Sequence, residues 1–188
     1  MITKKAKEYN GYLDIANSKD APVDVDILVL DINGKPRKEL LRGVLGAFKI
    51  LYGSGEYLLK CTKDLGDPTF EEAKSSLRVA ASLLKLALET VNPLDKDRIC
   101  REAFGAIFHA TRIASMVYLS TEVGRWGFIK RELPEPYGTS FNEFINTLHI
   151  KYFYNGNYPR DRVEEEFNEW FRKVEAYVDD LESKVKRK

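Results

Sequence analysis

The chain contains no glutamine, and it has only two cysteines and two histidines among 188 residues. Two cysteines on predicted helices, Cys61 and Cys100, are too few to hold a small secreted fold together, so we expect free thiols and a cytoplasmic protein. A charged fraction of 31% without glutamine is a bias of heat-adapted proteins and indicates a thermophile.

Long apolar runs are missing as well. No stretch of 18 apolar residues occurs, and the amino-terminal segment lacks the charged-then-apolar pattern of a secretion signal. We therefore expect no membrane association. The net charge of +1 is too small to attract nucleic acid or an anionic membrane over the whole surface. Any such binding has to be local.

Metal-binding spacings are also absent, since neither Cys-x-x-Cys nor His-x-x-x-His occurs. The string Asp24-Val-Asp26 resembles the magnesium-binding strand of nucleotidyltransferases. The Gly-Ser segment expected before it is missing, however, and about 35 residues are too few for that domain. We predict no metal and no cofactor, and we interpret residues 23–29 as an alternating strand.

Apolar spacing predicts a mainly α fold, an up-and-down helical bundle at residues 36–188 behind an amino-terminal arm at 1–35. The arm is extended or forms a short strand, whose partner would be the amino terminus in a hairpin or the same strand of a second protomer. Thr69 with Glu72, and Ser140 with Glu143, have capping-box spacing. A broken link spans residues 122–139. The predicted helices cover residues 36–60, 69–91, 95–121, 140–155 and 159–185.

The predicted helix of residues 98–119 has two chemically different faces. One is an ordinary core stripe that includes Phe104 and Ile107. The other combines guanidinium groups, a histidine and a glycine, although glycine lowers helix stability. A solvated face rarely needs glycine or methionine, so we expect this face to contact another chain or a ligand. Its residues are Arg98, Arg101, Glu102, Gly105, His109, Arg112 and Met116.

This face suggests two kinds of site. Gly105 and Ala106 would let a second helix approach closely, and with His109 and Met116 they form the predicted homodimer interface. His109 could instead act as a general base on a ribose hydroxyl, with Arg101 or Arg112 stabilising the phosphate. The alternative for His109 is a hydrogen bond within a helix interface. His149 is interpreted as structural.

The predicted link 122–139 interleaves aromatic and basic residues from Gly124 to Arg131. Single-stranded nucleic acid is bound by such a mixture of stacking and phosphate contacts, although Trp126 could equally cap the core. We predict a possible binding surface for RNA or a nucleotide made of Arg98, Arg101, Arg112, Trp126 and Arg131.

Residues 70–185 resemble the HEPN domain of the nucleotidyltransferase-associated type. The resemblance rests on Arg101-Glu-Ala-Phe-Gly-Ala-Ile-Phe-His109-Ala-Thr-Arg112 and on a loose echo of Phe-x-x-Tyr-x-x-Gly at residues 152–156. It implies a helical bundle, homodimerisation through the second helix and a partner role in nucleotide-handling systems. In HEPN ribonucleases four to six residues separate the Arg from the His, whereas seven residues separate Arg101 from His109.

These observations favour a non-catalytic, dimeric HEPN-like protein that binds a partner protein or a nucleotide or RNA. Two alternatives stay open. One is a divergent, metal-independent endoribonuclease with His109, Arg101 and Arg112 in its site. The other is a purely structural helical interaction module.

Overall fold

A computed structural model describes residues 2–3, 30–31, 41, 56–63 and 65–187. The predicted strand at 23–29 and most of the predicted helix at 36–60 lie outside these residues. The described residues up to 66 belong to one compact unit, and residues 67–187 belong to a second. The sequence predicts the boundary between the amino-terminal arm and the bundle at residue 35.

The first unit contains two strands of two residues each, β1 (Ile2–Thr3) and β2 (Leu30–Asp31), and the helix α3 (Glu56–Lys63). The strands pair in parallel, with Ile2 opposite Leu30 and Thr3 opposite Asp31. The expected hairpin involves the strand predicted at residues 23–29, which lies outside the described residues.

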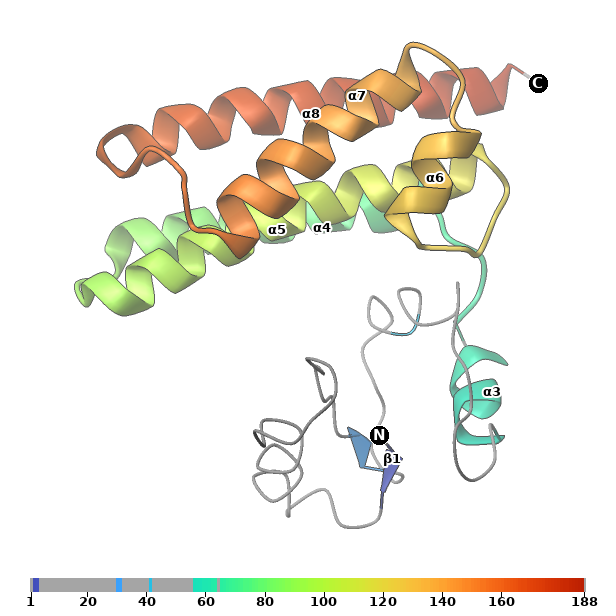
Figure 1. The fold of residues 1–188 in the computed structure, drawn as a ribbon, viewed down its shortest axis with the longest axis horizontal. Helices are drawn as coiled ribbons and strands as arrows, with labels where there is room; N and C mark the ends of the chain where they lie inside the picture. Colours follow the sequence, from blue (N-terminus) through green and yellow to red (C-terminus); the bar gives the residue numbers. More distant parts are fainter. Residues whose placement is uncertain (1, 4–29, 32–40, 42–55, 64, 188) are drawn as a thin grey trace, which may run out of the picture. The chain divides into compact units, whose positions relative to one another are not determined.

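The second unit is a helical bundle, which confirms the predicted fold class (Figure 1). Its long helical segments follow one another in alternating directions. A short helix, α6, lies between the second and third of them. The elements are α4 (Phe70–Glu89), α5 (Pro93–Tyr118), α6 (Trp126–Glu132), α7 (Tyr137–Phe144), the π-helix η2 (Ile145–Tyr154), the 3-10 helix η3 (Arg160–Arg162) and α8 (Val163–Lys186).

Side-chain caps fix where α4 and α5 begin. The Thr69 hydroxyl accepts the Glu72 N–H at 3.1 Å, as the sequence predicts. Asn92 Oδ1 accepts the N–H groups of Leu94 at 2.9 Å and Asp95 at 3.3 Å, and Pro93 occupies the first turn of α5. The helix therefore begins two residues before the predicted start.

Helix α5 is the centre of the bundle and packs against α4, α6, α7, η2 and α8. The Phe104 ring is fully buried and contacts the rings of Tyr152, Tyr158 and Phe167, with centroids 4.8–5.8 Å apart. Burying one such ring stabilises the fold by roughly 1.5–3 kcal/mol. This cluster ties α5 to η2 and α8.

Apolar spacing predicts a buried stripe on α4 that begins at Ala73, Leu77, Ala80 and Leu84 and continues to Leu88 and Val91. The first four are buried, but the stripe ends earlier than predicted, because Leu88 is 39% exposed and Val91 is 93% exposed. Ala87 replaces Leu88 as its last buried member.

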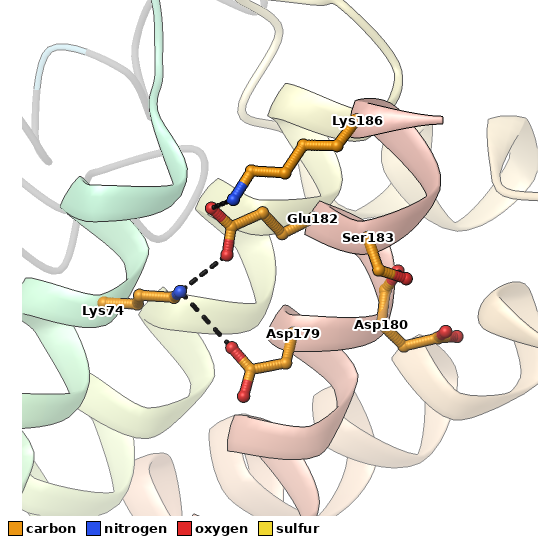
Figure 2. A network of polar contacts seen from close by, with 6 residues as sticks. All are labelled: Lys74, Asp179, Asp180, Glu182, Ser183 and Lys186. Atoms are coloured by element: carbon orange, nitrogen blue, oxygen red, sulfur yellow. Dashed lines mark hydrogen bonds and ion pairs between the residues drawn. The ribbon is translucent and has the colours of Figure 1, made fainter. Parts of the chain in front are cut away.

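Two kinds of polar contact hold α8 in place. Figure 2 shows Lys74 of α4 reaching Glu182 at 2.6 Å and Asp179 at 3.4 Å, while Lys186 reaches Glu182 at 2.9 Å. Hydrogen bonds from Lys74 and Lys186 lower the pKa of Glu182. In the interior, the hydroxyls of Ser115 and Tyr177 lie 2.8 Å apart and join α5 to α8.

The segment between α5 and α8 differs most from the prediction. The predicted link contains α6, and α7 begins at Tyr137, where the Glu135 carboxylate accepts the Thr139 N–H at 3.3 Å. Ser140 lies inside α7, so its predicted capping role is wrong. The second half of the predicted helix is π-helical.

Each unit contains one free thiol. Cys61 lies in α3 and is partly exposed, whereas Cys100 lies in α5 and is buried. Burial raises the pKa of the Cys100 thiol.

Candidate functional site

Part of the polar face of α5 packs against other helices of this chain, and this corrects one residue of the predicted dimer interface. Met116 is 0% exposed and belongs to the core. Gly105 faces Phe153 of η2, whose Cδ2 would lie 2.8 Å from a Cβ at this position. Met116 therefore cannot contact a second chain. Gly105 packs against Phe153 of its own chain and is partly exposed. Ala106 and His109 remain partly exposed.

Arg101 has a structural partner as well. Its Nε donates to the carbonyl oxygen of Phe153 at 2.7 Å, and one terminal nitrogen donates to that of Tyr154 at 2.5 Å. The guanidinium therefore holds the carboxyl end of η2. Arg98, one turn earlier on α5, is exposed.

His109 and Arg112 pair with each other on α5. The terminal nitrogen of Arg112 lies 2.9 Å from Nδ1 of His109 and 3.4 Å from Nε2. Arginine can only donate, so the nearer ring nitrogen accepts through its lone pair. A general base needs such a lone pair for its substrate. This geometry matches the interpretation in which His109 hydrogen-bonds at a helix interface.

Around His149 the structure gathers rings from three elements. The His149 ring stacks on Phe108 of α5 with centroids 4.5 Å apart and lies nearly parallel to Phe153 at 5.8 Å. The rings of Tyr154 and Trp126 meet it edge-on at 4.7 Å and 6.4 Å. We call these five residues the aromatic cluster.

The charge state of His149 follows from this environment. Burial, and secondarily the nearby positive charge of Arg112, lower its pKa from 6.5 to about 4. The imidazole is therefore neutral near pH 7. It offers one donor and one acceptor without adding charge to the cluster.

The outer members of the cluster are open to solvent. Trp126 is 43% exposed and Tyr154 is 61% exposed. The expectation that Trp126 caps the core holds only for part of its ring. Exposed cations lie close in sequence on the same elements, namely Arg125, Lys130 and Arg131 at α6 and Lys151 on η2.

Of the predicted ligand-binding residues, the structure places Trp126 and Arg112 around His149. Arg101 is joined to the same region through Phe153 and Tyr154. Sequence reasoning missed His149, Phe153 and Tyr154 as site residues. The signal was the aromatic-rich string His149-Ile-Lys-Tyr-Phe-Tyr154, which predicts a core stripe as readily as a surface.

A hollow of about 570 Å³ lies at the start of α8. Its arginines already have acidic partners, Asp97 at 2.7 Å from Arg160 and Glu166 at 3.6 Å from Arg162. The paired charges leave little net field to attract an ion.

Within the described part of the chain, no three His, Cys, Asp or Glu side chains are grouped so that they could hold a metal. No helix of that part is long and apolar enough to cross a bilayer.

Comparisons of this chain with protein-family models, with curated proteins and with solved structures found no match.

Proposed function

We propose that this chain is a non-catalytic helical protein that binds a nucleotide or single-stranded RNA at the aromatic cluster. One observation carries the proposal: two exposed rings, Trp126 and Tyr154, stand edge-on against a partly buried, neutral imidazole, His149. Exposed aromatic rings that are held in place by packing against neighbouring rings provide surfaces on which unpaired bases stack.

The charges around the cluster support an anionic ligand. The exposed cations of α6 and Lys151 are concentrated on the two elements that carry the exposed rings. A protein with a net charge of +1 has no long-range field, so phosphate binding would depend on these local cations. A purely protein-binding patch would not require cations on both elements.

The non-catalytic part of the proposal is supported by His109. Its Nδ1 lies 2.9 Å from a terminal nitrogen of Arg112, a group that can only donate. His109, the candidate base, and Arg112, the candidate phosphate ligand, are then hydrogen-bonded to each other. The HEPN resemblance stays a prediction and is compatible with this function.

Homodimerisation also stays a prediction, but without the buried Met116 in its interface. The mass in solution, measured by light scattering, would be twice the 21.6 kDa of the chain if it holds.

Binding is tested with a labelled single-stranded RNA of about ten nucleotides. Trp126→Ala and Tyr154→Ala should each weaken binding by about 1–3 kcal/mol, because each removes one stacking surface, with little change in salt dependence. Arg131→Gln should flatten the plot of log affinity against log salt by about 0.7, the value for one single-strand phosphate. Lys85→Gln, which removes an exposed cation of α4, is the matched control and should leave both quantities unchanged.

The other outcomes separate the alternatives. RNA that does not bind even at low salt would refute the proposal and leave protein interaction as the function. Metal-independent cleavage of the RNA that His109→Ala abolishes would instead establish the ribonuclease.

A further inference from the structure

The carboxyl end of η2 needs hydrogen-bond donors from outside the helix. The last carbonyl groups of any helix lack partners within it. Here the carbonyl oxygen of Ile150 accepts the Asn155 N–H at 3.0 Å, and that of Lys151 accepts the Asn157 N–H at 2.9 Å. The final two carbonyls, those of Phe153 and Tyr154, both accept from Arg101 of α5.

Arginine suits this position for two physical reasons. Its planar fork presents two N–H groups at a fixed spacing, which matches two consecutive carbonyls. Its positive charge also complements the negative end of the helix dipole. Gly156 follows with a φ of +65°, a conformation that favours glycine, and it lies beside Arg101, since a Cβ there would be in ordinary contact with Arg101 Cδ at 3.5 Å.

Gly105 adds a second restraint one turn further along α5. A Cβ at this position would lie 2.8 Å from Cδ2 of Phe153, closer than side chains normally come. The glycine therefore lets Phe153 lie directly on α5. Arg101 and Gly105 together fix the residues on either side of the Phe153–Tyr154 peptide bond.

We infer that Arg101 is a positioning residue for the ligand site: it holds the end of η2 so that the Tyr154 ring stands against His149. This inference rests on the proposed function, since it gives Arg101 a role in RNA binding without contact to RNA. The sequence alone suggests the opposite role, a guanidinium that binds phosphate directly.

The positioning itself is tested without RNA. The ring protons of Tyr154 sense the His149 ring 4.7 Å away, so their NMR shifts report its placement. Arg101→Ala should move these shifts towards those of an unfolded chain. Arg172→Ala is the matched control, because Arg172 is an exposed arginine that donates to Asn168 of its own helix, and it should leave them unchanged.

Arg101→Lys covers the case in which the alanine variant does not fold. Lysine keeps the charge but lacks the fork, so it cannot hold both carbonyls in the same way. A folded lysine variant with displaced Tyr154 shifts supports the inference. Wild-type shifts in a folded variant of either kind overturn it.

RNA binding then separates positioning from direct contact. If Arg101 acts through Tyr154, Arg101→Ala lowers affinity about fivefold or more with an unchanged salt slope, and it adds nothing to Tyr154→Ala. A slope reduced by about 0.7, with additive losses, would show a phosphate contact and overturn the inference. If no variant and no wild-type protein binds RNA, the proposed function fails, while the NMR shifts still decide whether Arg101 positions Tyr154.

Discussion

Glycine lowers the stability of a helix because it gains more backbone freedom on unfolding than other residues. Two helical glycines of the bundle differ in their surroundings. At Gly127 of α6, an added Cβ would meet nothing within 4 Å, whereas at Gly105 it would meet the Phe153 ring at 2.8 Å. Replacing glycine with alanine therefore tests packing at Gly105 and helix propensity at Gly127.

We predict that Gly127→Ala raises the free energy of unfolding by up to about 1 kcal/mol through helix propensity. Gly105→Ala gains the same helix propensity, but it forces Phe153 to move, which costs about 1–3 kcal/mol. Urea denaturation of both variants should place Gly105→Ala below Gly127→Ala by about that difference. Equal stabilities would show that Phe153 yields without cost.

The chemical character of the α5 face could be predicted at this scale, but the group that it contacts could not. Gly105 and Met116 are unusual on a solvated helix, and the structure explains the first by the approach of η2 and the second by burial in the core. Sequence periodicity reports that a face is special. It does not distinguish a second chain from another helix of the same chain, because both bury similar atoms.

Hydrogen bonds between elements contribute differently to the free energy of unfolding according to their burial. The Lys74–Glu182 contact of Figure 2 joins α4 to α8 at the surface, where such pairs contribute at most about 1 kcal/mol and weaken in salt. The Ser115 hydroxyl lies 2.7 Å from the Thr111 carbonyl, to which it donates, so Tyr177 is the donor to Ser115 inside the core. Burial raises the pKa of Tyr177, which keeps its proton in place.

We predict that Tyr177→Phe lowers the free energy of unfolding by about 1–2 kcal/mol, because Ser115 loses a buried donor. Lys74→Gln should cost less than about 1 kcal/mol, and its effect should fade at high salt. Thermal unfolding of both variants at low and high salt measures these two effects. A Tyr177→Phe effect that salt removes would contradict a buried origin.

Among the elements, α4, α5 and α8 could be predicted because their apolar residues recur at helical spacing over five turns or more. Short α6 could not, since Gly124, Gly127 and Pro134 resemble a loop in sequence. The π-helical form of η2 was also beyond prediction. Its carboxyl end contacts Arg101 and Gly105, which lie about fifty residues earlier, and such long-range contacts leave no periodic signal in the sequence.

The pH dependence of stability belongs to the whole bundle, because protonation of one partly buried ring is linked to global unfolding. The pKa of His149 is about 4 in the folded protein and 6.5 when free. The unfolded chain therefore binds the proton more readily between these values. His149 contributes its full stability above about pH 6.5 and loses it as the pH falls towards 4.

We predict that the free energy of unfolding falls by about 1–2 kcal/mol between pH 6.5 and pH 5, reduced from the full linkage value because the ring is partly exposed. His149→Phe keeps the stacking on Phe108 and should remove most of this loss. Urea titrations at several pH values measure it. An unchanged pH profile in the variant would assign the loss to other groups.

The buried thiol of Cys100 can report the opening of the bundle. A thiol reagent reaches this sulfur only after α5 separates from its neighbours, so the rate of modification measures how often the bundle opens. Cys61 belongs to the other compact unit and is partly exposed, so its rate follows a different part of the chain. Two reaction rates on one unaltered polypeptide can thus be followed separately, one for each unit.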